Sequence, residues 1–232
     1  MTERALVSVV LIVRNGSRFL EQALDSVRTQ SYRPLEIIVV DGGSTDGTRA
    51  LARAQAGVRV IDQRAPGIAE AYNTGIDAAH GELLGFLSYD DVWVPEKLAL
   101  QVDFLRAHPE VRYTVGLLRY FLEPGCRLPR GMRPELLQRT HVGRVMETLV
   151  ARRTLFDEVG GFDPALRIAN DVDWFARVKD LGVPGAVLPQ LLLHKRIHDA
   201  NTSSDEAVNT GELLTVLGRS LARRRHPGGL PP

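Results

Sequence analysis

Apolar, β-branched runs alternate along the first part of the chain with segments whose apolar residues recur at helical spacing. Continuous apolar runs are typical of strands that are covered on both faces in a parallel sheet. They predict four strands, at residues 6–13, 35–40, 58–62 and 83–87. The segments between them predict helices at 17–28, from 44 or 45 to about 54, and at 68–79, with N-caps at Ser17 and at Ser44 or Thr45.

Strands and helices that alternate with short connections are the signature of a doubly wound sheet built from right-handed βαβ units. Ligands of such sheets bind beyond the carboxyl ends of the strands. We therefore expect the loops at 14–17, 41–48 and 88–92 to line one crevice.

The alternation becomes less regular after residue 94. The second part predicts, in order, a helix at 95–107, a strand at 112–121, an irregular segment rich in Pro, Gly and Arg at 123–139, a strand at 142–151, helices at 152–159 and 171–181, a strand pair within 185–195 and a helix at 212–225. We expect one domain over residues 1–210, with a division at residue 94, and a basic helix and tail at 211–232.

Composition narrows the class of protein. The 29 Lys and Arg residues against 28 Asp and Glu lack the basic excess of a nucleic-acid binder, and 44% hydrophobic residues exclude a disordered chain. A single cysteine, Cys126, cannot form an internal disulfide or a cysteine-rich zinc site and indicates a reducing compartment. The early apolar run at 5–13 is shorter than the ~20 residues that cross a bilayer, so we expect a cytoplasmic protein.

Acidic residues follow two of the predicted strands. Asp90 and Asp91 are adjacent carboxylates directly after the fourth strand, and they repel each other unless a cation or hydrogen-bond donors stabilise them. This placement favours a hard divalent ion. A pair of N-caps for the next helix is an equally weighted alternative. Asp41 and Asp46 flank a turn after the second strand with the same ambiguity, and Gly43 lets that backbone approach a ligand closely.

Several segments in a fixed order resemble family 2 glycosyltransferases, the inverting enzymes with the GT-A fold. They are DGGSTDGT at 41–48, GIAEAYNTGI at 67–76, the Asp90–Asp91 pair, GGFD at 160–163, NDVDW at 170–174 and RIH at 196–198. Together they cover about residues 7–203 and are far more specific than any one of them alone. The resemblance implies an α/β GT-A fold, a doubly wound, mixed, mostly parallel sheet flanked by helices.

In such enzymes the first half, here residues 1–94, binds a nucleotide-diphosphate sugar, and the second half, 95–210, binds the acceptor. The resemblance implies that Asp41 accepts a hydrogen bond from the base, Asn73 lines the nucleotide pocket and Asp90 contacts the ribose. Asp91 would hold Mn²⁺ or Mg²⁺, which neutralises the departing diphosphate. The remaining expected donor-binding residues are Val13, Asn15 and Gly43.

The same comparison gives His198 an expected role, and the residue types of Arg196 and Trp93 make them two further candidates. His198 matches a position at which a histidine joins the metal or the diphosphate, and its imidazole suits Mn²⁺ better than Mg²⁺. Arg196 would contact phosphate oxygens, with a solvated loop charge as the alternative. Trp93 would either stack on the sugar or fill the core.

An inverting transfer needs a carboxylate that takes the proton of the acceptor hydroxyl. In the family this base is the second residue of an acidic doublet, which corresponds to Asp171. Asn170 stands where an acid is common, which removes one source of a raised pKa. Asp173 lies about 200° around a helix from Asp171, so the two cannot face one hydroxyl. The alternative is that Asp171 caps the helix and Asp173 lies in solvent.

The expected reaction is transfer of a single sugar, with UDP as the default nucleotide from its frequency in the family. The Gln-x-x-Arg-Trp motif of processive synthases is absent from the sequence. A sugar-phosphate nucleotidylyltransferase and a non-catalytic nucleotide- or glycan-binding module are the alternative functions.

The acceptor stays open between a glycan, a lipid, a peptide and a small molecule. The basic segment at 123–139 indicates an acidic acceptor or a protein partner, although a solvated basic loop is the favoured interpretation. The basic tail at 211–232 would meet the inner face of a membrane or a second subunit, or keep the chain end soluble.

Overall fold

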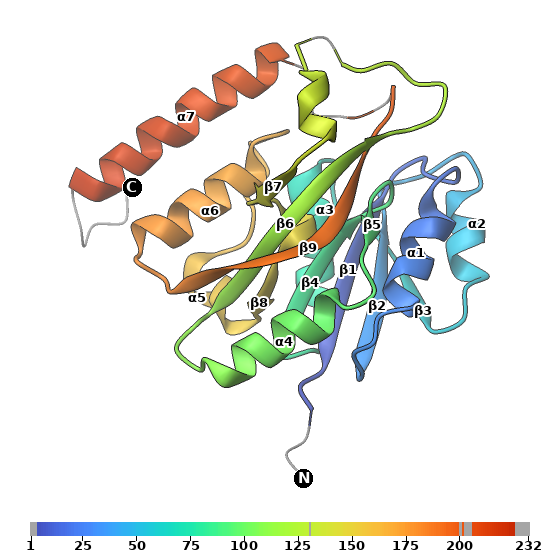
Figure 1. Cartoon of the computed structure of the whole chain (residues 1–232), viewed down its shortest axis with the longest axis horizontal. Helices are drawn as coiled ribbons and strands as arrows, with labels where there is room; N and C mark the ends of the chain where they lie inside the picture. Colours follow the sequence, from blue (N-terminus) through green and yellow to red (C-terminus); the bar gives the residue numbers. More distant parts are fainter. Residues whose placement is uncertain (1–3, 130, 200, 202–205, 226–232) are drawn as a thin grey trace.

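In the computed structural model, which describes residues 4–129, 131–199, 201 and 206–225, helices flank both faces of a mixed sheet (Figure 1). Within these residues the sheet has nine strands, eight of them in the order β3-β2-β1-β4-β8-β6-β9-β5, and β7 pairs with β6. This arrangement confirms the predicted α/β class.

The first half is a parallel βαβ array. Its strands are β1 (Val7–Val13), β2 (Leu35–Asp41), β3 (Val58–Asp62) and β4 (Leu83–Ser88), and its helices are α1 (Leu20–Arg28), α2 (Thr48–Arg53) and α3 (Ile68–Ala78). β1 lies between β2 and β4 and is parallel to both. The four strands were predicted to within one residue at each end.

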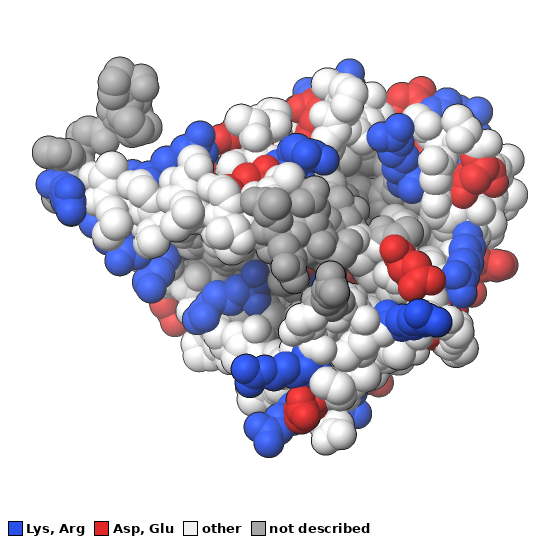
Figure 2. All heavy atoms as spheres, turned by 90° about the horizontal axis from the view of Figure 1, so that it is seen from above, with Lys and Arg blue, Asp and Glu red and all other residues white. Residues whose placement is uncertain are grey.

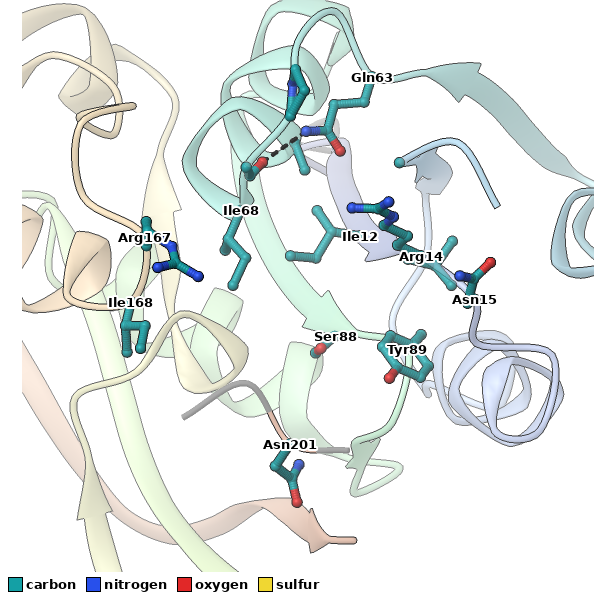
Figure 3. Close-up of a pocket in the computed structure, with 15 residues that line it drawn as sticks. Ile12, Arg14, Asn15, Gln63, Ile68, Ser88, Tyr89, Arg167, Ile168 and Asn201 are labelled. Carbon is teal, nitrogen blue, oxygen red and sulfur yellow. Dashed lines mark hydrogen bonds between the residues drawn. The ribbon is translucent and has the colours of Figure 1, made fainter. Parts of the chain in front are cut away.

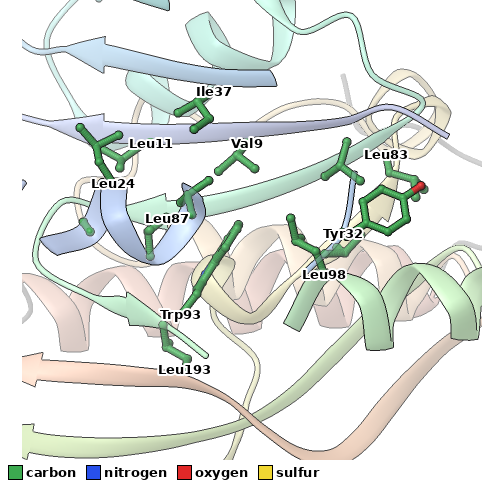
Figure 4. Packing of buried hydrophobic residues seen from close by; sticks show 14 of the residues in the cluster. Val9, Leu11, Leu24, Tyr32, Ile37, Leu83, Leu87, Trp93, Leu98 and Leu193 are labelled. Atoms are coloured by element: carbon green, nitrogen blue, oxygen red, sulfur yellow. The ribbon is translucent and has the colours of Figure 1, made fainter. Parts of the chain in front are cut away.

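The central strand β1 is buried along its whole length. Val9 and Leu11 face one hydrophobic core with residues of α1 and α4 (Lys97–Ala107), and Figure 4 shows this packing. Val10 and Ile12 face a second core with residues of α3. Because both faces are covered, alternation of apolar and polar residues is lost and the strand is apolar throughout.

The second half adds antiparallel strands to the same sheet. The short strand β5 (Val92–Trp93) still belongs to the first half. The remaining elements of the second half are β6 (Tyr113–Leu122), the 3₁₀ turn η1 (Pro134–Leu137), β7 (Thr140–Gly143), the 3₁₀ turn η2 (Met146–Thr148), β8 (Val150–Arg152), α5 (Thr154–Val159), α6 (Asn170–Asp180), β9 (Gly185–Ile197) and α7 (Glu206–Arg225). β8 pairs antiparallel with β4 and with β6, so it joins the two halves. β9 runs parallel to β6.

Two predicted strands of this half were wrong in form. The strand predicted at 142–151 is divided into β7 and β8 by η2, because the Thr148 hydroxyl donates to the Gly143 carbonyl while Met146 is buried. The strand pair predicted within 185–195 is one long strand, β9, whose pairing with β6 shifts register.

Helix α7 begins at Glu206, earlier than the predicted 212, and packs on α6. Val216 lies against Leu166 and Ala169, and Asp180 of α6 pairs with two arginines of α7. The opposite side of α7 is exposed and includes leucines, with basic residues toward the helix end (Figure 2); the leucines are Leu213, Leu214, Leu217 and Leu221.

These ion pairs place arginines of the predicted basic tail against an acid of the body. No helix in the part of the chain that the structure describes is long and apolar enough to cross a bilayer. Contact of the tail with a membrane or a second subunit stays a prediction, and residues 226–232 of the predicted tail lie outside the described residues.

Gly75 allows α3 to approach β1 closely. A Cβ atom at this position would lie 2.2 Å from Cγ1 of Val10. We expect Gly75→Ala to lower the free energy of unfolding by about 1–3 kcal/mol, measured by urea denaturation, because the core cannot accept the added methyl.

Gly218 of α7 is the matched control, since no atom lies within 4 Å of a Cβ built there. Gly218→Ala should raise the free energy of unfolding by about 0.5–1 kcal/mol through helix propensity. Equal effects of the two substitutions would contradict this packing.

Candidate active site

A cavity of about 690 Å³ opens beyond the carboxyl ends of β1 and β4 (Figure 3). Asn15, Gly42 and Tyr89 all line it, so the three loops that were expected to share a crevice do so. The second half contributes Arg167 and Ile168, which face the cavity from the opposite side. This is the position at which α/β sheets bind ligands.

Hydrogen bonds between two loops build one wall of the cavity. The Asn15 backbone N–H donates to Ser44 Oγ over 2.9 Å, and Thr45 N–H donates to Asn15 Oδ1 over 2.8 Å. Asp46 accepts hydrogen bonds from Ser17 N–H and Oγ–H, at 3.1 and 2.9 Å. The 14–17 and 41–48 loops therefore hold each other in place.

These contacts correct the predicted N-caps. α1 begins after Phe19 and α2 begins after Gly47, and neither helix has a side-chain capping bond. Ser17, Ser44 and Thr45 bond across the loops instead, because the parallel sheet brings the ends of β1 and β2 together.

The expected donor-binding residues of the first half divide into two groups. Val13 and Asn15 line the cavity. Asp41 is buried, and its carboxylate is 2.9 Å from the Arg49 guanidinium. Gly43 has a positive φ of 79°, but its neighbour Gly42 is the residue that lines the cavity.

Asn73 is not among the residues that line this cavity. Its side-chain amide accepts from Phe162 N–H and donates to the Phe162 carbonyl, both over 2.8 Å. A Cβ atom at Gly161 would lie 2.4 Å from Asn73 Oδ1. Asn73 therefore joins α3 to the loop before α6, and the glycine makes room for it.

Asp90 and His198 meet beside the cavity. His198 Nε2 lies 3.0 Å from Asp90 Oδ2, and Asn201 Nδ2, from a residue that lines the cavity, lies 3.3 Å from the same oxygen. Both members of the pair are buried. The histidine predicted as a metal ligand thus contacts Asp90 rather than Asp91.

Asp91 is only 1% exposed and belongs to a buried ion cluster. Lys195 Nζ lies 2.9 Å from its carboxylate and 3.6 Å from that of Glu147, and the Arg196 N–H donates to Asp91 over 2.8 Å. Burial disfavours the ammonium, but Asp91 and Glu147 together raise the pKa of Lys195 well above its ordinary value.

Arg196 and Trp93 do not fit their predicted substrate contacts. Arg196 is buried between the rings of Phe19 and Phe121, and its guanidinium donates to the Asp90 carbonyl over 2.8 Å and pairs with Glu123. Trp93 is 2% exposed in the core and donates from Nε1 to the Glu147 carbonyl over 2.7 Å. Of the two alternatives for Trp93, core filling is therefore correct.

Asp171 is the second residue of α6, which begins at Asn170. It follows three residues after Ile168, which lines the cavity. Burial, reinforced by the negative charge of Glu147, raises the pKa of Asp171 to about 6, although the Val172 N–H opposes the shift. An acid at position 170 would have raised the pKa of Asp171 by its like charge; in this chain Glu147 of η2 supplies that negative charge instead. Asn170 itself is buried, and its Nδ2 has no hydrogen-bond partner.

Asp173 is structural. It is buried, not solvated as in the alternative interpretation, and it accepts from Arg177 Nε over 2.8 Å. Arg177 also donates to the carbonyls of Val159 and Gly161, each over 2.6 Å. This pair anchors the loop that precedes α6. Asp171 is therefore the acid of this motif that stays free of Arg177 and that lies nearer in sequence to the cavity-lining Ile168.

Sequence reasoning missed several residues of the site. Glu147 falls inside a segment that was assigned to a strand, so no local signal identified it. Lys195 directly precedes the motif at 196–198, and Arg167 stands three residues before the motif at 170–174; closeness to these motifs was the signal that could have found both residues. Figure 3 shows Arg14 and Arg167 extending into the cavity from its two sides.

A bound divalent ion fits the donor set of Asp90 and His198. A carboxylate oxygen and an imidazole nitrogen suit Mn²⁺, and substrate phosphates and water complete such sites. No group of three or more His, Cys, Asp or Glu side chains within the described residues is arranged to hold a metal by itself.

The sequence matches one family model over most of this architecture. The model described as Glycosyl transferase family 2 matches residues 8–169, which is more than half of the chain. The chain belongs to glycosyl transferase family 2. An uncharacterized glycosyltransferase of Rickettsia typhi is 30% identical over 221 residues, which are 88% of this chain and 67% of the relative. The chain spans about two thirds of the length of this relative and of a second one from Rickettsia prowazekii, and about a third of longer curated relatives such as the chondroitin synthase of Escherichia coli.

Solved structures of glycosyltransferases share the fold. S. aureus TarS in complex with UDP-GlcNAc aligns with a TM-score of 0.72 and 20% identity, over 92% of this chain and 65% of that one. The mannosyltransferase PcManGT from Pyrobaculum calidifontis, in complex with GDP-Man and Mn²⁺, aligns with a TM-score of 0.72 and 22% identity, over 100% of this chain and 67% of that one. The likeness confirms the predicted GT-A type of fold for this family 2 chain.

Asp46 provides a test of the loop wall. Although partial burial opposes ionisation, hydrogen bonds from Thr48 and Ser17 lower the pKa of Asp46 to about 2. We expect Asp46→Ala to lower the free energy of unfolding by about 0.5–1.5 kcal/mol at neutral pH. Because the stabilisation requires the carboxylate, the deficit should persist above about pH 4 and shrink as the pH falls toward 2.

The control is Asp25→Ala, which removes an exposed pair with Arg28 on α1. Denaturant titrations should place its effect within about 0.5 kcal/mol of wild type. A deficit in Asp46→Ala that does not depend on pH would refute the role given to the carboxylate.

Proposed function

We propose that this chain is an inverting glycosyltransferase that moves one sugar from a nucleotide-diphosphate sugar to an acceptor hydroxyl. The observation that carries the proposal is Asp171, a carboxylate of raised pKa in the first turn of α6, three residues after the cavity-lining Ile168. On the other side of the cavity are the loops of the nucleotide-binding half and the Asp90–His198 pair. The donor would therefore lie between the two halves, with the base on the side of the second half.

The donor binds with its nucleotide against the loops after β1 and β2. UDP is the first nucleotide to test, and GDP the second, because S. aureus TarS was solved with UDP-GlcNAc and PcManGT with GDP-Man. Arg14 and Arg167 supply positive charge inside the cavity, which favours an anionic diphosphate.

Asp90 and His198 would hold the divalent ion, whose chemistry is to neutralise the charge that develops on the departing diphosphate. PcManGT, which contains Mn²⁺, supports Mn²⁺ as the first ion to test and Mg²⁺ as the second. The predicted ligand Asp91 would have to exchange Lys195 for the ion, so the geometry favours Asp90.

Asp171 acts as the general base. Its carboxylate takes the proton of the acceptor hydroxyl while the oxygen forms a bond to the anomeric carbon, and the bond from that carbon to the diphosphate breaks on the opposite face. A pKa of about 6 keeps the group ionised at neutral pH while making it a stronger base than an ordinary aspartate.

The direct test is a screen of UDP- and GDP-sugars with Mn²⁺ or Mg²⁺, with release of the nucleoside diphosphate as the signal. Turnover favours the transferase, whereas nucleotide binding without turnover, across donors and acceptors, would favour the non-catalytic binding module. Family membership makes the sugar-phosphate nucleotidylyltransferase the weakest of the three functions.

The pH dependence of the rate follows from Asp171. Because the base must be ionised, kcat/KM should rise with pH through an apparent pKa near 6 and fall tenfold per pH unit well below it. Asp171→Asn should lower kcat by about 10²–10⁴-fold with nucleotide affinity retained. Asp157→Asn, on the exposed side of α5, should behave as wild type, and a full rate in Asp171→Asn would exclude this base.

Calorimetry with UDP and GDP, with and without Mn²⁺, separates the two candidate carboxylates. Asp90→Asn and His198→Gln should each abolish the metal-dependent part of nucleotide affinity, because they remove one donor of the pair. Asp91→Asn should keep that part while lowering thermal stability, since Lys195 loses its closest partner. The reverse pattern would make Asp91 the ligand.

A further inference from the structure

Glu212 of α7 holds the segment that connects the cavity with the proposed base. Its carboxylate accepts three successive backbone hydrogen bonds, from the N–H groups of Arg167, Ile168 and Ala169, at 2.7, 2.8 and 2.9 Å. Three donors converging on one carboxylate fix both the direction and the position of this backbone.

Residues 167–169 connect the cavity at one end with the start of α6 at the other. Arg167 and Ile168 line the cavity, and Figure 3 shows the Arg167 side chain pointing into it. Ala169 is the N-cap residue of α6, and the proposed base Asp171 follows two residues later.

Alanine at an N-cap has no side chain with which to bind the free N–H groups of a helix start, and α6 has no side-chain capping bond of its own. Glu212 therefore supplies from another helix a carboxylate that such a terminus favours. Burial acts against ionisation, but the three backbone hydrogen bonds hold the pKa of Glu212 below its ordinary value, so the group is charged at neutral pH.

Other contacts attach α7 without reaching this segment. Arg219 pairs with Asp163 over 2.7 Å, and Arg224 pairs with Asp180 over 2.7 Å at the far end of α6. The docking of α7 thus has several anchors, of which Glu212 is the one that bonds to the backbone between Arg167 and Ala169.

We propose that Glu212 is a positioning residue for transfer: by clamping residues 167–169 it sets the Arg167 guanidinium in the donor cavity and Asp171 at the start of α6. The inference rests on the proposed function. It assigns the C-terminal helix a part in the reaction, beyond the basic and solubilising tail that the sequence indicated.

The test compares Glu212→Gln with Arg219→Gln, which removes a similar contact of α7 but leaves the clamp. An amide at 212 presents an NH₂ group where a backbone N–H needs an acceptor, so the segment must shift. We expect Glu212→Gln to lower kcat about tenfold and to raise the KM for the donor, because a small misplacement of reacting groups is costly. Glu212→Asp, which keeps the charge, should recover part of kcat.

Hydrogen exchange provides the readout that does not depend on turnover. The amides of Arg167, Ile168 and Ala169 should exchange faster in Glu212→Gln than in Arg219→Gln, at equal thermal midpoints. If the wild type is active and the kcat and KM values of Glu212→Gln and Arg219→Gln agree to within about twofold, the clamp is overturned and the proposed function stands. Wild type without turnover on any donor would overturn the proposed function, and this inference with it.

Discussion

The site depends on an ion cluster around the buried Asp91, in which one half-buried lysine joins two acids from different segments. Lys195 of β9 lies 2.9 Å from Asp91 and 3.6 Å from Glu147 of η2. Buried charges are costly unless they are paired, so this contact fixes the end of β9 against the acidic strand end and the 3₁₀ turn. The neighbouring residues Asp90 and His198 are thereby brought within 3.0 Å, and the charge of Glu147 helps to raise the pKa of Asp171.

The first half of the fold could be predicted because its signals are local. A buried parallel strand such as β1 is a continuous apolar run, and such runs end where the ligand-binding loops begin. The small polar residues of those loops could not be placed in the same way. Ser17 and Ser44 are residue types that often cap helices, yet their hydroxyls bond to groups 29 positions away, because strand pairing decides which loops become neighbours.

The second half was predicted less well, since its contacts are set by tertiary packing. Glu147 enters the site only because η2 interrupts the segment between β7 and β8. Arg196 was expected either to contact phosphate oxygens or to be a solvated charge, but two aromatic rings and Glu123 hold its guanidinium inside the protein. The family resemblance predicted that the Asp90–Asp91 pair and His198 act at the same metal ion. Only the three-dimensional arrangement showed that His198 contacts Asp90.

The central claim is that a nucleotide-diphosphate sugar binds in the cavity between the two halves, with a divalent ion on the Asp90–His198 side. The most direct measurement is a crystal structure with Mn²⁺ and a nucleoside diphosphate, with data collected at the manganese absorption edge. The account predicts one anomalous peak bound to Asp90 and His198, with the diphosphate in the cavity beside Arg167. A nucleotide that binds with the ion at another place in the structure would contradict it, and so would a nucleotide that binds outside this cavity.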